Sequence, residues 1–294
     1  MVASMDLLPE IDLAYYRRYA DLARLEPHEL VRHFEVHGAA EGRAASAAAF
    51  RESFLEYPAQ AHSVLEIGPF CNPCIRGTNV KYFDVLSSSD LKSRAKKIGY
   101  PIVFVPDVAF VSPNGNLRVV NETFSAVVSS HSIEHQPDLI KHLSDVCALL
   151  EPGGRYFLII PDKRFCFDHC LPDTTVADII EAHTEQRRTH RIGNVIEHRA
   201  LTTHNDAARH WQGDHVDRDY ADNIAPRTQQ AIREFKEAGG AYIDVHAWKF
   251  APNGFRQVMT QLTELGLTDL FPERVYQTPH GRNEFTAVLG KTST

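Results

Sequence analysis

The sequence predicts an α/β protein built on a doubly wound, mostly parallel sheet. From residue 63 onward, short apolar runs alternate with helical patterns, which is typical of strands joined by crossover helices. Several of the runs end at an acidic residue or at a glycine. No apolar stretch approaches the roughly 18 residues of a membrane span, so we expect no association with a membrane.

Six apolar runs are interpreted as strands: SVLEIG (63–68), VKYFDV (80–85), PIVFVPDV (101–108), FSAVVSS (124–130), GRYFLIIP (154–161) and NEFTAVLGK (283–291). The interval between the first two runs is too short for a full crossover helix, because parallel connections usually take a dozen or more residues. We therefore expect a shortened, irregular first connection.

Helical periodicity fills several of the intervals between the strands. One helix should begin around Pro137 and end at Gly153-Gly154. A second should begin at Pro252 and end at Gly266, since proline favours the first helical position and glycine the end. Further candidate helices cover residues 176–190 and 226–238.

The pattern divides the chain into three parts. Residues 1–57 predict an N-terminal helical segment, and residues 58–165 with 251–294 predict the α/β core. Residues 166–250 form an insertion of different character that contains eight of the sixteen histidines. We expect this insertion to act as a helical lid over the strand ends.

Charge and cysteine content narrow the class of protein. A formal charge of −7 and a pI near 6.1 argue against a broad nucleic-acid surface. The five cysteines are an odd number, and the N-terminus does not read as a signal peptide. Reduced thiols in the cytoplasm are the expected state, whereas the oligomeric state stays open.

The stretch SSHSIEHQPD contains His131, Glu134 and His135 in the order H-x-x-E-H, a spacing also found in zinc hydrolases. Such a site needs both histidines on one helical face, but Pro137 pushes the preceding residue out of helical geometry. The motif should therefore lie on a loop between a strand and a helix. A site of four cysteines (71, 74, 166, 170) is also disfavoured by its spacing, and we predict no metal ligands.

Four segments, in order, carry a resemblance to a known family: VLEIGPFCNP (64–73), YFDV (82–85), FSAVVSSHSIEHQPD (124–138) and LLEPGGRYFLIIPD (149–162). They resemble the class I, Rossmann-like methyltransferases that use S-adenosylmethionine, and in particular a subset encoded near glycan-biosynthesis pathways. The resemblance implies a seven-stranded sheet with the cofactor across the carboxyl ends of strands one to four. It also implies transfer of a methyl group to an acceptor.

The resemblance assigns cofactor roles to residues at or near the predicted strand ends: Glu66, Gly68, Pro69, Asp84, Asp107, Val108, Ser130, His131 and His135. Glu66 would serve the charged amino end of the cofactor, Asp84 the ribose hydroxyls, and Asp107 the adenine. A carboxylate at the end of a second strand accepts ribose hydroxyls in dinucleotide sites as well. One departure is clear: the family's first loop is usually G-x-G-x-G, and here only Gly68 remains.

Methyl transfer requires an aligned nucleophile, exclusion of water and often removal of a proton, for which histidine titrates in a suitable range. Candidate bases or substrate contacts in and next to the insertion are His169, His204, His210 and Asp162. The acceptor would be an oxygen or nitrogen of a small molecule or sugar. Alternatives that remain open are a non-catalytic binding module of the same fold, a lid-held divalent metal that orients the acceptor, and a metal-dependent hydrolase or lyase.

Overall fold

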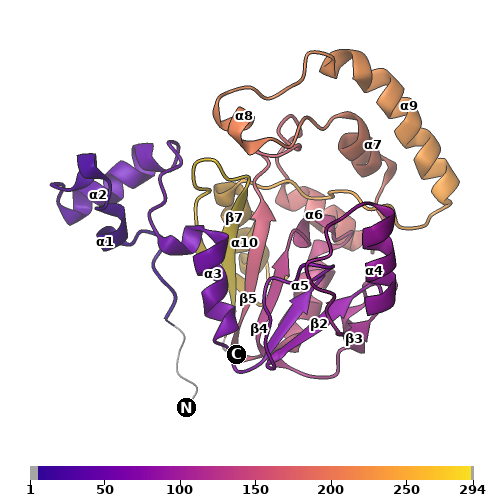
Figure 1. The fold of residues 1–294 in the computed structure, drawn as a ribbon, viewed down its shortest axis with the longest axis horizontal. Helices are drawn as coiled ribbons and strands as arrows, with labels where there is room; N and C mark the ends of the chain where they lie inside the picture. Colours follow the sequence, from indigo (N-terminus) through magenta and orange to yellow (C-terminus); the bar gives the residue numbers. More distant parts are fainter. Residues whose placement is uncertain (1–5, 293–294) are drawn as a thin grey trace.

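The computed structural model describes residues 6–292 and contains a seven-stranded sheet in the order β3-β2-β1-β4-β5-β7-β6 (Figure 1). The strands are β1 Val64–Ile67, β2 Val80–Asp84, β3 Val108–Val111, β4 Phe124–Ser130, β5 Leu150–Pro161, β6 Leu270–Val275 and β7 Glu284–Lys291. All neighbouring pairs are parallel except those made by β7, which runs antiparallel to both β5 and β6. This order confirms the predicted doubly wound class and its seven strands.

Parallel pairing places the carboxyl ends of the central strands at one edge of the sheet. Ile67 of β1 lies beside Phe83 of β2 and Ser129 of β4, and Ser130 lies beside Ile159 of β5. The antiparallel β7 enters at the same edge, with its first residue, Glu284, beside Pro161. Side chains from five strands therefore meet at this edge.

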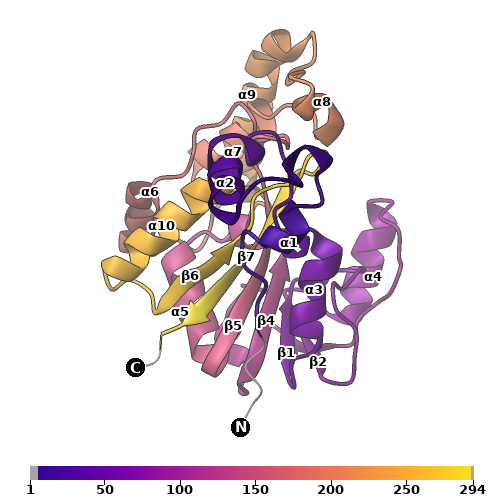
Figure 2. The ribbon, with the colours of Figure 1, turned by 90° about the vertical axis from the view of Figure 1, so that its left-hand side faces the viewer.

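Both faces of the sheet are covered, because residues along each buried strand alternate between the two sides. On one face, α5 (Leu139–Leu149) and α10 (Pro252–Glu264) pack with α6 (Val176–Thr184) on the main core. On the other face, α3 (Arg51–Ala59) packs on a smaller core with strand residues (Figure 2). Phe157 and Leu158, adjacent in β5, belong to these two different cores.

The short helices expected in the N-terminal segment are present: α1 Leu13–Tyr16, η1 Ala20–Leu22, α2 Pro27–His33, η2 Phe34–Gly38 and η3 Ala47–Ala49. They enclose a small core of their own around Tyr16, Leu22, Leu30 and Phe34. Figures 1 and 2 show this segment beside the sheet, next to the turn that joins β6 to β7.

The insertion forms α6 and then α7 (Ile192–Ala200), α8 (Ala207–Trp211) and α9 (Tyr220–Ala238). Helices α7, α8 and α9 lie beyond the strand ends in Figure 1, and α7 packs against α9. Between β2 and β3 lies α4 (Ser88–Lys97), whereas β1 and β2 are joined without a helix, as the short interval predicts.

Several element boundaries differ from the predictions. The third strand begins at Val108 instead of ending there, so Asp107 precedes β3 and is exposed. Pro101 and Pro106 lack the N–H that a sheet ladder needs, and only the residues after them pair with β2. Three helices, α4, α7 and α8, and the edge strand β6 were not predicted; α6 is shorter than expected, and α9 begins earlier.

Within residues 6–292, no helix combines the length and the apolar character needed to cross a membrane.

Gly42 marks where the N-terminal segment meets the lid, and it yields a first prediction. Its φ is +71°, and a methyl group there would lie 2.5 Å from Cη2 of Trp211 and 2.8 Å from the His280 nitrogen. Gly42→Ala should lower the free energy of unfolding by about 2 to 4 kcal/mol, since backbone strain and overpacking add. Denaturant unfolding measures this change.

Gly115→Ala is the matched control. Gly115 has a similar φ of +68°, but a methyl group there would meet no described atom within 4 Å. We expect it to cost only the backbone strain, about 1 to 2 kcal/mol. Equal losses in the two variants would contradict a tight contact between the N-terminal segment and α8.

Candidate active site

The first loop, residues 68–79, is held by a buried acid. Glu66 is 2% exposed, and its two carboxylate oxygens accept the backbone N–H groups of Cys74 at 2.7 Å and Ile75 at 3.1 Å. Burial raises the pKa of Glu66 to about 7, although these two hydrogen bonds act in the opposite direction. The carboxylate therefore fixes the loop, and the cofactor contact predicted for Glu66 stays a prediction.

Next to it, Gly68 and Asp84 lie at the ends of β1 and β2. The Gly68 N–H donates to the carbonyl of Phe83, and its φ of +71° favours glycine. A methyl group at Gly68 would approach only Ser132 Oγ, at 3.8 Å, so the backbone is open on this side. Asp84 is 7% exposed; its carboxylate accepts the N–H of Leu86 at 3.0 Å, and burial raises its pKa.

A charged network, which sequence reasoning missed, joins the ends of β4 and β7. Arg51 of α3 donates from Nε and Nη2 to the Glu284 carboxylate at 2.9 and 2.7 Å, and also to Ser130 Oγ at 2.9 Å. His131 Nε2 lies 2.7 Å from the same carboxylate. Desolvation alone would raise the pKa of Glu284, but His131 and Arg51 lower it to about 2.

The H-x-x-E-H motif lies on a loop, as expected. His131 has a φ of +50°, and Glu134 with His135 forms the short 3-10 turn η5 (Ile133–His135) before α5 begins at Leu139. The two histidines have different carboxylate partners, because His135 Nδ1 lies 3.0 Å from Asp244 of the lid. They do not share a helical face.

The lid closes over this motif through the buried Glu134. Its backbone carbonyl accepts the N–H groups of Ala247 at 2.7 Å and Trp248 at 3.2 Å. In the same segment, His246 Nδ1 hydrogen-bonds Asp168 Oδ2 at 2.6 Å. Glu134, Asp168 and His246 are all buried, and the His246 imidazole can serve as a proton acceptor or as a metal ligand.

The predicted lid histidines lie in one cluster. His169 and His210 rings are stacked 5.2 Å apart, His204 and His210 lie 4.3 Å apart, and His215 stacks on His169 at 3.7 Å. The ring of His169 is anchored through Nδ1, which lies 2.7 Å from the carbonyl of Arg164. Three of the four histidines in this cluster, His169, His204 and His210, were thus candidates from the sequence, and His215 is the fourth.

Asp162 is fully buried, and its carboxylate is engaged in hydrogen bonds. Its carboxylate accepts hydrogen bonds from Arg164 and, at 2.5 Å, from Thr278 Oγ1. The remaining predicted cofactor residues differ in exposure: Pro69 is buried, Val108 and Ser130 are half-buried, and His131 is exposed.

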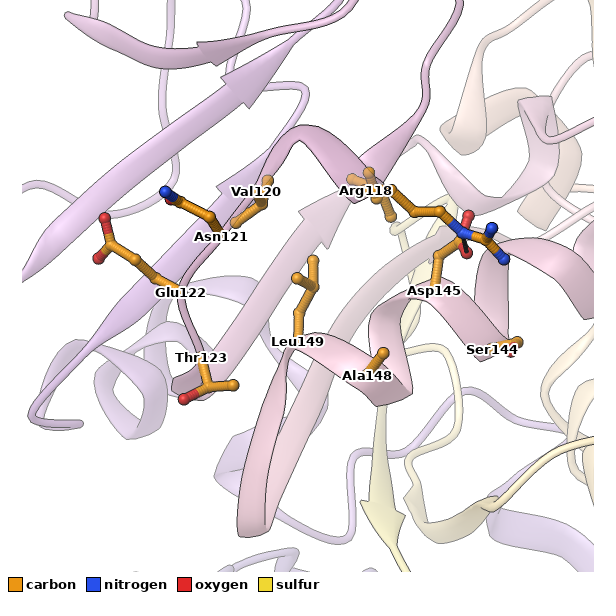
Figure 3. A pocket seen from close by; sticks show the side chains of 10 residues that line it. Arg118, Val120, Asn121, Glu122, Thr123, Ser144, Asp145, Ala148 and Leu149 are labelled. Atoms are coloured by element: carbon orange, nitrogen blue, oxygen red, sulfur yellow. Dashed lines mark hydrogen bonds and ion pairs between the residues drawn. The ribbon is translucent and has the colours of Figure 1, made fainter.

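A surface hollow of about 530 Å³ lies elsewhere. Figure 3 shows that its lining comes from the segment before β4 and from α5, including Arg118, Glu122, Asp145 and Leu149. These residues lie at the amino end of β4, opposite the strand ends described above. None of the predicted site residues lines it.

The sequence pattern of a family described as "Methyltransferase domain" matches residues 39–239, more than half of the chain. The chain belongs to this family. The matched range extends from the N-terminal segment to the end of α9. It includes β1 to β5 and most of the histidine-rich insertion, whereas His246, β6 and β7 lie after it. No curated protein matches the chain.

The solved structures that the chain resembles are similar to it only at low identity and low TM-score. The CcbJ methyltransferase from Streptomyces caelestis matches with 20% identity, a TM-score of 0.28, and coverage of 39% of this chain and 52% of that one. An S-adenosylmethionine-dependent methyltransferase from Clostridium acetobutylicum matches with 13% identity and a TM-score of 0.30, over 50% of this chain and 62% of that one. Magnesium protoporphyrin IX methyltransferase from Synechocystis PCC 6803 matches with 8% identity and a TM-score of 0.36, over 91% of this chain and 100% of that one. The match thus spans 52% and 62% of the first two chains.

The charged network at the ends of β4 and β7 gives a pH-dependent prediction. Because the pKa of Glu284 is lowered from an ordinary 4.5 to about 2, its stabilisation is complete above pH 5 and is lost as the pH falls through 2. Glu284→Gln should cost about 3 kcal/mol of unfolding free energy at pH 7 and about 1.5 at pH 3. Guanidinium unfolding at both pH values measures the difference.

Glu122→Gln is the matched control, since Glu122 forms an ion pair with Lys81 in which both side chains are more than 40% exposed. An exposed pair should contribute less than about 1 kcal/mol. If the cost of Glu284→Gln were as small as this, or were larger at pH 3 than at pH 7, the assigned role of Glu284 would be wrong.

Proposed function

We propose that this methyltransferase domain uses S-adenosylmethionine to methylate an oxygen or nitrogen of a small molecule or a sugar, in glycan or secondary metabolism. The observation that carries the proposal is the strand order, which gathers Gly68, Asp84 and His131 at one edge beneath a polar lid. The link to glycan metabolism rests on the sequence resemblance alone.

The residues at this edge fit the cofactor's chemistry. Gly68 leaves room for a ligand against the backbone, and the buried Asp84 carboxylate offers acceptors for ribose hydroxyls. When bound, S-adenosylmethionine supplies an electrophilic methyl group on a sulfonium. The protein's part is to orient the acceptor, exclude water and hold the proton that leaves it.

Hydrogen bonding supports His169 as the base among the predicted candidates. Its Nδ1–H donates to the Arg164 carbonyl, so Nε2 of the neutral ring retains a free lone pair. Both nitrogens of His204 are already used, since Nε2 donates to the Asp214 carbonyl and Nδ1 accepts the Asp206 N–H. His210 is similarly engaged, with the His204 carbonyl and His215.

Asp84 provides the test of the cofactor site. Asp84→Asn should weaken binding of the demethylated product, S-adenosylhomocysteine, by about 10-fold or more, because an amide cannot accept two ribose hydroxyls as a carboxylate can. Isothermal titration calorimetry measures this affinity. Glu122→Gln, at the opposite edge of the sheet, should bind as the unaltered chain does.

The proposed function would be wrong if the unaltered, folded chain gave neither heat nor thermal stabilisation with millimolar S-adenosylmethionine. It would also fail if the cofactor bound but no methyl group reached any acceptor in a panel of sugars, phenols and amines assayed with labelled cofactor.

His169 provides the test of the base, with an acceptor from that panel. His169→Gln should lower kcat by about 10²- to 10⁴-fold and remove the acidic limb of the pH profile, while cofactor affinity stays the same. His204→Gln, from the same cluster, should change kcat by less than about threefold. Equal losses in the two variants, or an unchanged pH profile in the first, would contradict the assignment.

A further inference from the structure

Glu134 has a buried carboxylate that accepts no hydrogen bond from any residue between 6 and 292. The residue is 1% exposed, and both of its side-chain oxygens are without a hydrogen-bond partner there. An ionised carboxylate in a protein interior is expected to be paired or to coordinate a metal, because losing its hydration is costly. The groups around Glu134 are imidazoles, and they lie just beyond hydrogen-bond distance.

Two histidines direct the same ring nitrogen toward this carboxylate. His135 Nε2 lies 3.7 Å from Glu134 Oε1, and His246 Nε2 lies 3.9 Å from the same oxygen. One ligand atom from each of the three residues lies within 4.8 Å of the other two. The rings are roughly perpendicular, with centroids 4.6 Å apart.

Each of these histidines is backed by a carboxylate at its other nitrogen. Asp168 Oδ2 hydrogen-bonds His246 Nδ1 at 2.6 Å. Asp244 Oδ1 lies 3.0 Å from His135 Nδ1, which is an ion-pair distance, but the two atoms are not aligned as a hydrogen bond. Metal-binding histidines typically use one nitrogen for the ion and hydrogen-bond a carboxylate or carbonyl through the other. The arrangement therefore supplies both the ligand atoms and the groups that orient them.

We propose that Glu134, His135 and His246 bind a divalent transition-metal ion such as Zn²⁺, with Asp244 and Asp168 orienting the two imidazoles. The sequence alone predicted no metal ligands. This proposal differs from that prediction because folding brings His246, Asp168 and Asp244, which are distant in the chain, next to Glu134 and His135. Two imidazoles and one carboxylate favour zinc or another first-row transition metal over Mg²⁺ or Ca²⁺, which prefer all-oxygen ligands.

The spacing of the ligand atoms fits such an ion after a small adjustment. Metal–ligand bonds of about 2.0 to 2.1 Å in a tetrahedral site separate the ligand atoms by about 3.3 Å. The observed 3.7 and 3.9 Å require each side chain to move inward by a few tenths of an ångström. Rotation about the terminal torsions of glutamate and histidine is soft enough for this movement.

A competing cluster in the lid fits an ion less well. His169, His210 and His215 also bring ring nitrogens within 4.8 Å of one another. However, His169 and His215 stack face to face at 3.7 Å, and the His210 nitrogens contact His215 and the His204 carbonyl. No carboxylate takes part in this triad, and it provides the control for the experiment.

The position of the Glu134 site suggests what the ion does. Glu134 and His135 lie in η5, a few residues after the end of β4, and His246 reaches them from the lid. Three protein ligands leave a coordination position open, as in catalytic zinc sites. That position would hold an oxygen of the methyl acceptor and orient it. This role of the ion rests on the proposed function, whereas the binding of the ion does not.

The experiment measures metal binding by the full chain without cofactor or acceptor. Protein stripped with EDTA is titrated with Co²⁺, followed by visible absorption, and with Zn²⁺, followed by calorimetry and thermal unfolding. We expect one tightly bound ion and a higher Tm. Glu134→Gln should abolish tight binding, Asp168→Asn should weaken it about 10- to 100-fold, and His210→Gln should leave it unchanged.

Circular dichroism shows whether the variants fold. If Glu134→Gln does not fold, the metal affinity of Asp168→Asn tests the proposal instead. The inference is overturned if the stripped chain binds neither Co²⁺ nor Zn²⁺ tightly, if only Mg²⁺ binds, or if His210→Gln abolishes binding while Glu134→Gln retains it. Calorimetry with S-adenosylhomocysteine on the same samples separates the two proposals, since a chain that binds the nucleoside but no metal refutes only this one.

Discussion

The bidentate ion pair between Arg51 and Glu284 holds together the edge of the sheet on which the site depends. Both side chains are largely withdrawn from water, so the geometry must be good to offset their desolvation. The two parallel N–H···O contacts meet that condition. Through Ser130 and His131, the pair also fixes the end of β4. Residues more than 230 positions apart in the chain thereby define one surface.

The lid is joined to the same edge by a second set of contacts, centred on η5. The carbonyl of Glu134 binds two lid N–H groups, while its carboxylate faces two imidazoles, one of them on the lid. Closing the lid therefore both buries the acid and brings His246 beside it. If an ion neutralises this acid, the cost of burying the charge falls, and lid closure and metal binding favour each other.

Periodicity predicted the fold well because it is set locally. Buried strands such as β4, and helices such as α10 that begin at a proline and end before a glycine, were recognisable from a few neighbouring residues. The third strand was misplaced because an apolar run, 102–104, lies exposed next to Pro101 and Pro106. The site was harder to predict than the fold, because several of its residues act only through contacts with residues distant in the chain. These are Arg51, Asp168, His246 and Glu284. Glu134 was visible within its motif, but its missing hydrogen-bond partner was not.

The missing glycines of the first loop have a structural explanation in the same terms. In a standard crossover, a helix N-terminus after the first strand presents free N–H groups that bind anionic groups. Here residues 68–79 contain no helix, and the N–H groups of Cys74 and Ile75 are taken up by Glu66. Charged groups available near this loop are therefore side chains, among them Arg51, which reaches Cys74 Sγ at 3.6 Å. A loop that no longer presents its backbone to a ligand no longer needs three glycines, and Gly68 remains where the backbone is still open.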